Sequence, residues 1–135
     1  MRPGELNGVR VLVVDDNADT RQILQTWFEY ISASVMTAAS ADEALFVIAH
    51  FSPHIVLTDI SMPRHDGYWL LRELRALEQA RRSQRTPVVA MTALEYYDSG
   101  LQAARAGFDG WVCKPFDLSD LSALVERITR RRRTA

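Results

Sequence analysis

The sequence is short of cysteine and lysine and has no long apolar run, and each shortage excludes a class of protein. Its single cysteine, Cys113, excludes an intrachain disulfide and fits a reducing compartment. No apolar segment approaches the roughly 18 residues that a membrane-spanning helix needs. Residues 1–8 also lack the apolar stretch of a signal peptide. The sequence therefore predicts a cytoplasmic protein that does not enter a membrane.

Lysine is almost absent from a chain that is rich in arginine. Of 16 basic residues, only Lys114 is a lysine. Ammonium is a compact point charge, whereas guanidinium is a planar fork, so a lone lysine indicates a position where the smaller group is required. Chance could also leave a single lysine, so this observation gains weight only from the residues around it.

The 135 residues have the length and composition of one globular domain, with 47% hydrophobic and 24% charged residues. The formal net charge of -1 conceals an uneven distribution, because Asp15, Asp16 and Asp19 lie near the start and residues 130–133 are all arginine. We expect an N-terminal tail at 1–8, one domain at 9–129 and a basic tail at 130–135. The arginines are interpreted as a solvated tail, and contact with nucleic acid or an acidic partner is the alternative.

Short apolar runs rich in β-branched residues predict four buried strands of a parallel sheet, at 9–14, 55–57, 88–91 and 111–113. A weaker run at 34–38 predicts a strand at the edge of the sheet.

Apolar residues at helical spacing predict helices between these strands. A capping box from Ser40 to Glu43 opens one helix, Asp66 and Gly67 precede another, and a less periodic helix is expected at 96–106. The first and last helices have apolar stripes formed by Ile23, Leu24, Trp27, Phe28 and Ile31, and by Leu118, Leu121, Leu124, Val125 and Ile128.

Five strands that alternate with five helices predict a doubly wound α/β domain with right-handed crossovers and helices on both faces. In such folds a ligand binds beyond the carboxyl ends of the strands, where the strand order reverses. The residues that follow the strands are therefore the candidates for function.

Residues that handle phosphate or metal follow four of the predicted strands: Asp15 and Asp16, then Asp59, Thr92 and Lys114. Each alone is more simply explained as a helix cap, a turn residue or a solvated charge. Together they conflict, because at an effective dielectric of about 20 two unit charges roughly 4 Å apart cost on the order of 4 kcal/mol. A hard divalent cation, Mg²⁺ or Mn²⁺, together with the lysine, would balance the three carboxylates.

These residues, together with the segment 61–67 (SMPRHDG) and Lys114-Pro115, resemble the receiver domain of response regulators in two-component signalling. The resemblance extends from about residue 9 to 128. Within the family, the sequence is similar both to stand-alone receivers and to receivers of hybrid histidine kinases. It implies a flavodoxin-like fold, with a parallel five-stranded sheet in the order 2-1-3-4-5 and five helices.

The resemblance implies that Asp59 accepts a phosphoryl group from a histidine kinase or a phosphotransfer protein. Asp15, Asp16, Asp59 and the backbone carbonyl of Ser61 would hold the metal ion, and Thr92 and Lys114 would bind the phosphoryl oxygens. The chain would be a signalling switch that catalyses its own phosphorylation and dephosphorylation.

The resemblance also assigns the coupling of phosphorylation to partner binding. Thr92 would move towards the phosphoryl group, and Trp111 would follow at a position where receivers usually have tyrosine or phenylalanine. Ser61 and Leu94 occupy positions that tune the phosphoryl lifetime, and Lys114-Pro115 is expected to be cis.

Other functions are less consistent with these residues. A flavodoxin needs a neutral loop after the first strand, a haloacid-dehalogenase phosphatase needs an aspartate where Ser61 stands, and the three histidines lack the spacing of zinc ligands. A pseudo-receiver that never accepts phosphate is the main alternative. Because no pair of DNA-binding helices is recognised, direct nucleic-acid binding is not expected. The downstream partner stays open, as does a homodimer through the fourth and fifth helices.

Overall fold

A single sheet of five parallel strands organises the computed structural model, which describes residues 4–93 and 99–134. The strand order β2-β1-β3-β4-β5 confirms the expected fold class. The strands are β1 (Arg10–Val14), β2 (Ser34–Ala38), β3 (Ile55–Asp59), β4 (Val88–Ala93) and β5 (Gly110–Lys114). The helices are α1 (Ala18–Tyr30), α2 (Ala41–Phe51), α3 (Gly67–Arg81), α4 (Ser99–Ala106) and α5 (Leu118–Thr134).

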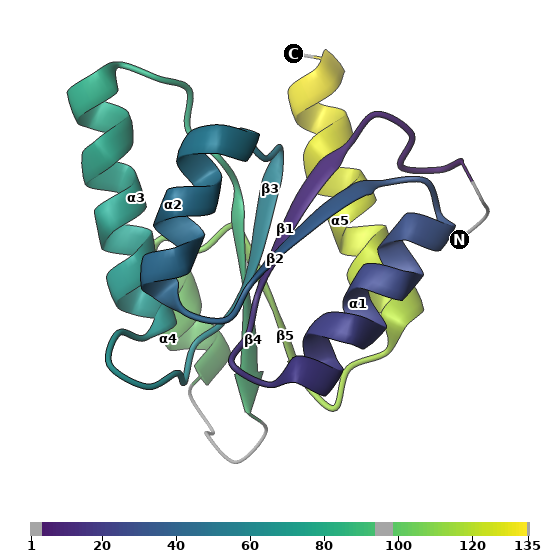
Figure 1. Cartoon of the computed structure of the whole chain (residues 1–135), viewed down its shortest axis with the longest axis horizontal. Coiled ribbons are helices and arrows are strands. Elements are labelled where there is room, and N and C mark those ends of the chain that lie inside the picture. Colours follow the sequence, from purple (N-terminus) through teal and green to yellow (C-terminus); the bar gives the residue numbers. More distant parts are fainter. Residues whose placement is uncertain (1–3, 94–98, 135) are drawn as a thin grey trace.

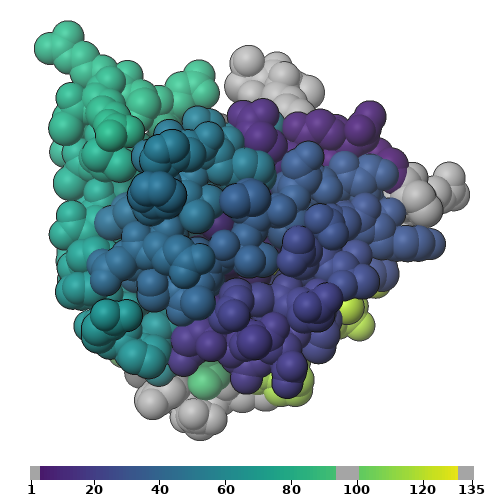
Figure 2. Space-filling view, viewed as in Figure 1, coloured from purple at the N-terminus to yellow at the C-terminus, as the bar shows by residue number. Residues whose placement is uncertain are grey.

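The sheet separates two hydrophobic cores, because successive side chains of a strand point to opposite faces. In β1, Leu12 and Val14 belong to the core beneath α2 and α3, whereas Val11 and Val13 belong to the core beneath α1 and α5. Helices α1 and α5 cover one face of the sheet, and α2, α3 and α4 cover the other (Figure 1). The space-filling view shows α1, β2 and α2 spread across one side of the molecule, with α3 along its margin (Figure 2).

The predicted strands are confirmed, and the edge position of β2 is confirmed as well. The apolar stripe of α1 was wrong at one residue, because Ile23 is 55% exposed while Leu24 and Phe28 are fully buried. Adjacent residues of a helix are 100° apart, so a stripe centred on Leu24 and Phe28 leaves Ile23 on its flank.

Residues near both ends of the described chain take part in regular contacts or secondary structure. Leu6 is fully buried, and its N–H donates to the carbonyl of Ile31 at 3.0 Å. At the other end α5 continues to Thr134, so the backbone at 130–134 is helical. The domain limits at 9 and 129 stay a prediction. The roles suggested for Leu94 and for the start of the fourth helix at 96–98 lie outside the described residues.

Local signals start the helices that border the strand ends. The Asn17 side chain accepts the N–H of Thr20 at the start of α1, and Ser40 accepts that of Glu43 at the start of α2, as the capping box predicts. Asp66 caps α3 by accepting the N–H of Trp69 at 2.8 Å. No helix in the described part of the chain is both long and apolar enough to span a bilayer.

Gly67 brings the start of α3 against the end of β3. Its N–H donates to the carbonyl of Ile60 at 2.8 Å, which closes the loop between the two elements. A Cβ at this position would lie 2.7 Å from the backbone oxygen of Asp59 and 2.9 Å from the Cα of Ile60. Since both neighbours are backbone atoms, only glycine permits this approach.

Substitution of Gly67 by alanine should therefore destabilise the fold, by about 1–3 kcal/mol as for other overpacked sites. Urea unfolding measures the change. Glu73→Ala, on the exposed face of the same helix, is the matched control and should change the free energy of unfolding by less than about 0.5 kcal/mol. Equal stabilities of the two variants would contradict the close approach.

Candidate functional site

Three carboxylates meet at the carboxyl ends of β1 and β3, where the sequence placed them. Oxygen atoms of Asp15, Asp16 and Asp59 all lie within 4.8 Å of one another. The two strands are neighbours in the sheet, so residues that follow each of them share one edge. Asp15 is fully buried, Asp16 is exposed, and the side chain of Asp59 is 13% exposed.

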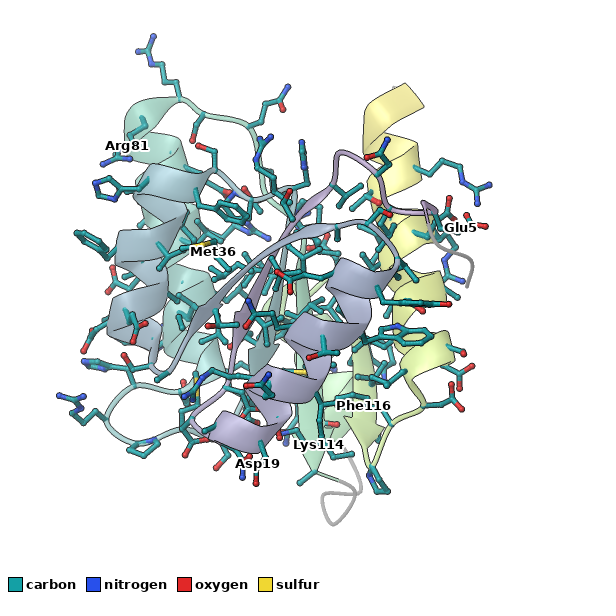
Figure 3. The ribbon with its side chains drawn as sticks, turned by 45° about the vertical axis from the view of Figure 1, so that its right-hand side comes forward. Glu5, Asp19, Met36, Arg81, Lys114 and Phe116 are labelled. Atoms are coloured by element: carbon teal, nitrogen blue, oxygen red, sulfur yellow. The ribbon has the colours of Figure 1, made fainter. Side chains whose placement is uncertain are left out.

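Lys114 joins this group from the end of β5. Its Nζ lies 3.0 Å from Oδ2 of Asp15 and 3.3 Å from Oδ2 of Asp59. The strand that carries it is separated from β3 by β4, so the long side chain crosses the end of β4 to reach both carboxylates. Figure 3 shows Lys114 at the same end of the molecule as Asp19 in the first turn of α1, and Arg81 at the far end. The one lysine of the chain is thus part of the cluster.

The pKa values at the site follow from this crowding. Burial raises the pKa of Asp59, the negative charge of Asp15 raises it further, and Lys114 only partly opposes the shift. Burial alone would lower the pKa of Lys114, but its hydrogen bond to Asp15 and the charge of Asp59 raise it. The ammonium is therefore firmly charged, whereas the charge of Asp59 is disfavoured in the metal-free protein.

Thr92 lies between these groups in the register of the sheet. Its neighbour Met91 pairs with Asp59, and Ala93 pairs with Lys114. Thr92 is 2% exposed, and its hydroxyl donates to the carbonyl of Val112 at 3.3 Å. The backbone of Thr92 thus lies between the strand ends that carry Asp59 and Lys114, and its hydroxyl is bound to β5.

Of the other predicted site residues, Ser61 adjoins the carboxylate cluster and Trp111 lies exposed on β5. Ser61 is exposed and directly follows the cluster, where its N–H donates to Oδ1 of Asp59 at 3.3 Å. Trp111 is 43% exposed on β5. The peptide bond between Lys114 and Pro115 is cis, as the resemblance implies.

Sequence reasoning missed two residues that hold Asp15 in place. Arg21 of α1 donates from Nη1 to the Asp15 carbonyl at 2.7 Å, and the N–H of Asn17 donates to Oδ1 of Asp15 at 2.9 Å. Nothing in the pattern of the sequence distinguishes Arg21 from the other arginines.

A cavity at the opposite end of the sheet contains none of this chemistry. This cavity of about 500 Å³ opens at the amino ends of the strands, where Arg10, His54 and Thr86 line it. None of the predicted site residues borders it. Since strand-end carboxylates and a lysine carry recognisable chemistry and this cavity does not, the cluster is the stronger functional candidate.

The carboxylate cluster fits a hard divalent cation. Mg²⁺ binds oxygen ligands at roughly 2.1 Å, so two ligands of one ion lie within about 4.2 Å of each other. The three carboxylates are already close to that limit. Three negative charges against one ammonium also leave two charges to be balanced, which is the charge of such an ion.

Comparison with known proteins identifies a family that covers most of the chain. The family description "Response regulator receiver domain" matches residues 11–126. The chain is 35% identical over 94% of its length to a probable transcriptional regulator, ycf27, of Cyanophora paradoxa, and 38% identical over 87% to the regulatory protein AtoC of Escherichia coli. It covers 51% and 24% of these proteins, so it spans about half or less of their length.

Solved structures of similar length share the whole fold. The receiver domain of the Francisella response regulator 1452 has a TM-score of 0.83 and 30% identity, with 93% of this chain and 99% of that chain covered. The chemotaxis response regulator CheY4 of Vibrio cholerae has a TM-score of 0.78 and 26% identity, with 89% and 98% covered.

The raised pKa of Asp59 predicts that Asp59→Asn stabilises the metal-free protein at neutral pH. A raised pKa means that folding favours the protonated carboxyl, so its contribution to stability is full below the unfolded pKa and is lost as the pH rises through the folded pKa. Urea unfolding in a metal chelator should show the variant to be more stable at pH 7, with the difference shrinking towards pH 4. A variant that is less stable at pH 7 would contradict this reading.

Proposed function

The chain belongs to the family of response regulator receiver domains, and we propose that it is a phosphorylation switch whose acceptor is Asp59. One observation carries the proposal: side chains from β1, β3 and β5 converge, so that Asp59 faces both the carboxylates of a candidate metal site and the ammonium of Lys114. The phosphoryl group would come from a phosphohistidine of a histidine kinase or a phosphotransfer protein.

Transfer would break the phosphorus–nitrogen bond of the donor and form a bond from phosphorus to a carboxylate oxygen of Asp59. The donor imidazole leaves with the electron pair of the broken bond, and the acceptor becomes an acyl phosphate. Since such a transfer has a loose transition state, positioning and neutralisation of charge are the main contributions of the protein. Asp59 is held for attack by the Ser61 N–H on one oxygen and by Lys114 on the other.

Asp15, Asp16, Asp59 and the Ser61 carbonyl are the residues that would hold Mg²⁺. The ion would neutralise charge on the phosphoryl oxygens and allow the dianionic donor to approach an acidic site. The chain's own part is structural: the buried Asp15 is fixed by Lys114, Asn17 and Arg21, while the exposed Asp16 leaves its oxygens accessible from solvent.

Phosphorylation would then be read out through Thr92. The new phosphoryl oxygens are strong acceptors, and Lys114 and the Thr92 hydroxyl are the donors beside them. To reach the phosphoryl group the hydroxyl must leave the Val112 carbonyl, which would change the end of β4 and its pairing with β5. The half-exposed Trp111 lies on that strand and is the proposed relay to a partner. The identity of that partner depends on the whole protein.

Lys114 provides the first test of the transfer chemistry. In Lys114→Met, phosphorylation by acetyl phosphate in Mg²⁺ should slow by about 10²-fold or more, as when one preorganised donor is removed. Lys114→Arg should recover only part of the rate, because the fork is larger than the ammonium. Intact mass over time measures the gain of one phosphoryl group, with Arg72→Lys on the exposed surface of α3 as control. A wild-type protein that never gains the group would favour the pseudo-receiver.

Thr92 provides a test of the switch apart from transfer. Wild-type protein should change its tryptophan fluorescence on binding beryllofluoride with Mg²⁺. Thr92→Ala should still bind but largely lose this change, while Thr92→Ser should retain it. The same titration of Trp111→Phe shows which part of the change comes from Trp111. A full change in Thr92→Ala would refute coupling through the hydroxyl.

A further inference from the structure

The loop between β3 and α3 is closed at its base by the backbone and held at its tip by side chains. At the base, the Gly67 N–H meets the carbonyl of Ile60. The tip contains Arg64, whose φ of 68° is in the left-handed region although it is not a glycine. A residue in that region persists only where the surroundings hold it there. The contacts of the tip therefore decide the shape of the loop.

His65 makes those contacts. Its ring stacks on Trp69, with ring centroids 3.8 Å apart and planes inclined by 13°. The ring Nε2 of His65 lies 3.9 Å from a carboxylate oxygen of Asp42 in the first turn of α2. The backbone N–H of His65 donates to the Pro63 carbonyl at 2.8 Å. One side chain thus connects the loop to both helices that border it.

Trp69 is itself a fixed support for the stack. Its N–H is bound by the capping carboxylate of Asp66, and its ring packs against the core beneath α2 and α3. The pair of His65 and Asp42 is weaker, because their side chains are 40% and 55% exposed and water screens the attraction. The stacking of His65 on Trp69 is consequently a stronger contact than the pair of His65 and Asp42.

The same loop begins with the residues of the site. Ser61 lies four residues before His65, its N–H binds Asp59, and its carbonyl is a proposed metal ligand. Between them Met62 is 9% exposed and acts as an apolar anchor. Only three residues separate Ser61 from His65. The direction of the Ser61 carbonyl therefore depends on the position in which His65 is held.

We propose that His65 is a positioning residue for the metal site: its stack on Trp69 holds the loop so that the Ser61 carbonyl is presented beside Asp16 and Asp59. This inference rests on the proposed function, because it assigns a role in the metal site of that function. His65 acts through the loop and touches neither the ion nor the phosphoryl group.

The test compares Mg²⁺ affinity in the wild type and three variants of the 135-residue chain by calorimetric titration with magnesium chloride. His65→Ala should weaken binding about twofold to tenfold, the range expected for loss of one aromatic pair. His65→Phe keeps a ring over Trp69 without the imidazole and should restore most of the affinity. His50→Ala is the matched control, because His50 is an exposed histidine of α2 whose ring lies 4.5 Å from that of Phe46, far from the loop. It should bind Mg²⁺ like the wild type.

A second readout follows the loop without metal. The amide resonance of Ser61 in a ¹H–¹⁵N spectrum should shift in metal-free His65→Ala, return towards the wild-type position in His65→Phe and stay unchanged in His50→Ala. Unchanged Mg²⁺ affinity in His65→Ala, or failure of His65→Phe to restore it, would overturn the proposal. Absence of Mg²⁺ binding by the wild type would instead overturn the proposed metal function, and the Ser61 resonance would still report whether His65 sets the loop.

Discussion

The ion pairs of Lys114 with Asp15 and Asp59 are the interaction on which the site depends. They connect the ends of β1, β3 and β5 across the intervening strand, at distances of 3.0 and 3.3 Å. A fully buried carboxylate such as Asp15 is costly unless it is paired and hydrogen-bonded, and here it has both an ammonium and a backbone donor. The remaining negative charge is left on Asp59 and Asp16, which face the candidate metal site.

This distribution of charge makes the site unfavourable by itself and receptive to cations. The pKa of Asp59 is raised by its burial even with Lys114 beside it, so the metal-free site holds more negative charge than its surroundings support. Native proteins often accept such local cost where function requires it. The supporting elements are correspondingly firm: a glycine that permits close approach, helix caps at Asn17 and Asp66, and a loop tied by aromatic stacking.

Sequence reasoning succeeded where one local rule decides the outcome. The strands follow from β-branched apolar runs, and the capping signals at Ser40 and Asp66 start helices where the sequence indicated. It failed where neighbours in space decide. Ile23 has the type and nearly the spacing of a core residue, yet the centre of the buried stripe lies at Leu24 and Phe28. Leu6 belongs to no periodic pattern, and it is buried because it joins the core that contains Phe28 and Ile31.

By itself, the sequence determined the order of strands and helices and the chemical groups that follow each strand, because hydrophobic periodicity and strand-end residues are local properties of the chain. Only the tertiary structure decided which of those groups touch. The pairing of β1 with β3 brings the carboxylates together, and the reach of Lys114 across β4 decides which oxygens it binds. The stack of His65 on Trp69, next to the left-handed residue Arg64, is likewise a contact that no spacing of residues reveals. Contacts between distant segments follow from packing, and packing is a property of the folded chain as a whole.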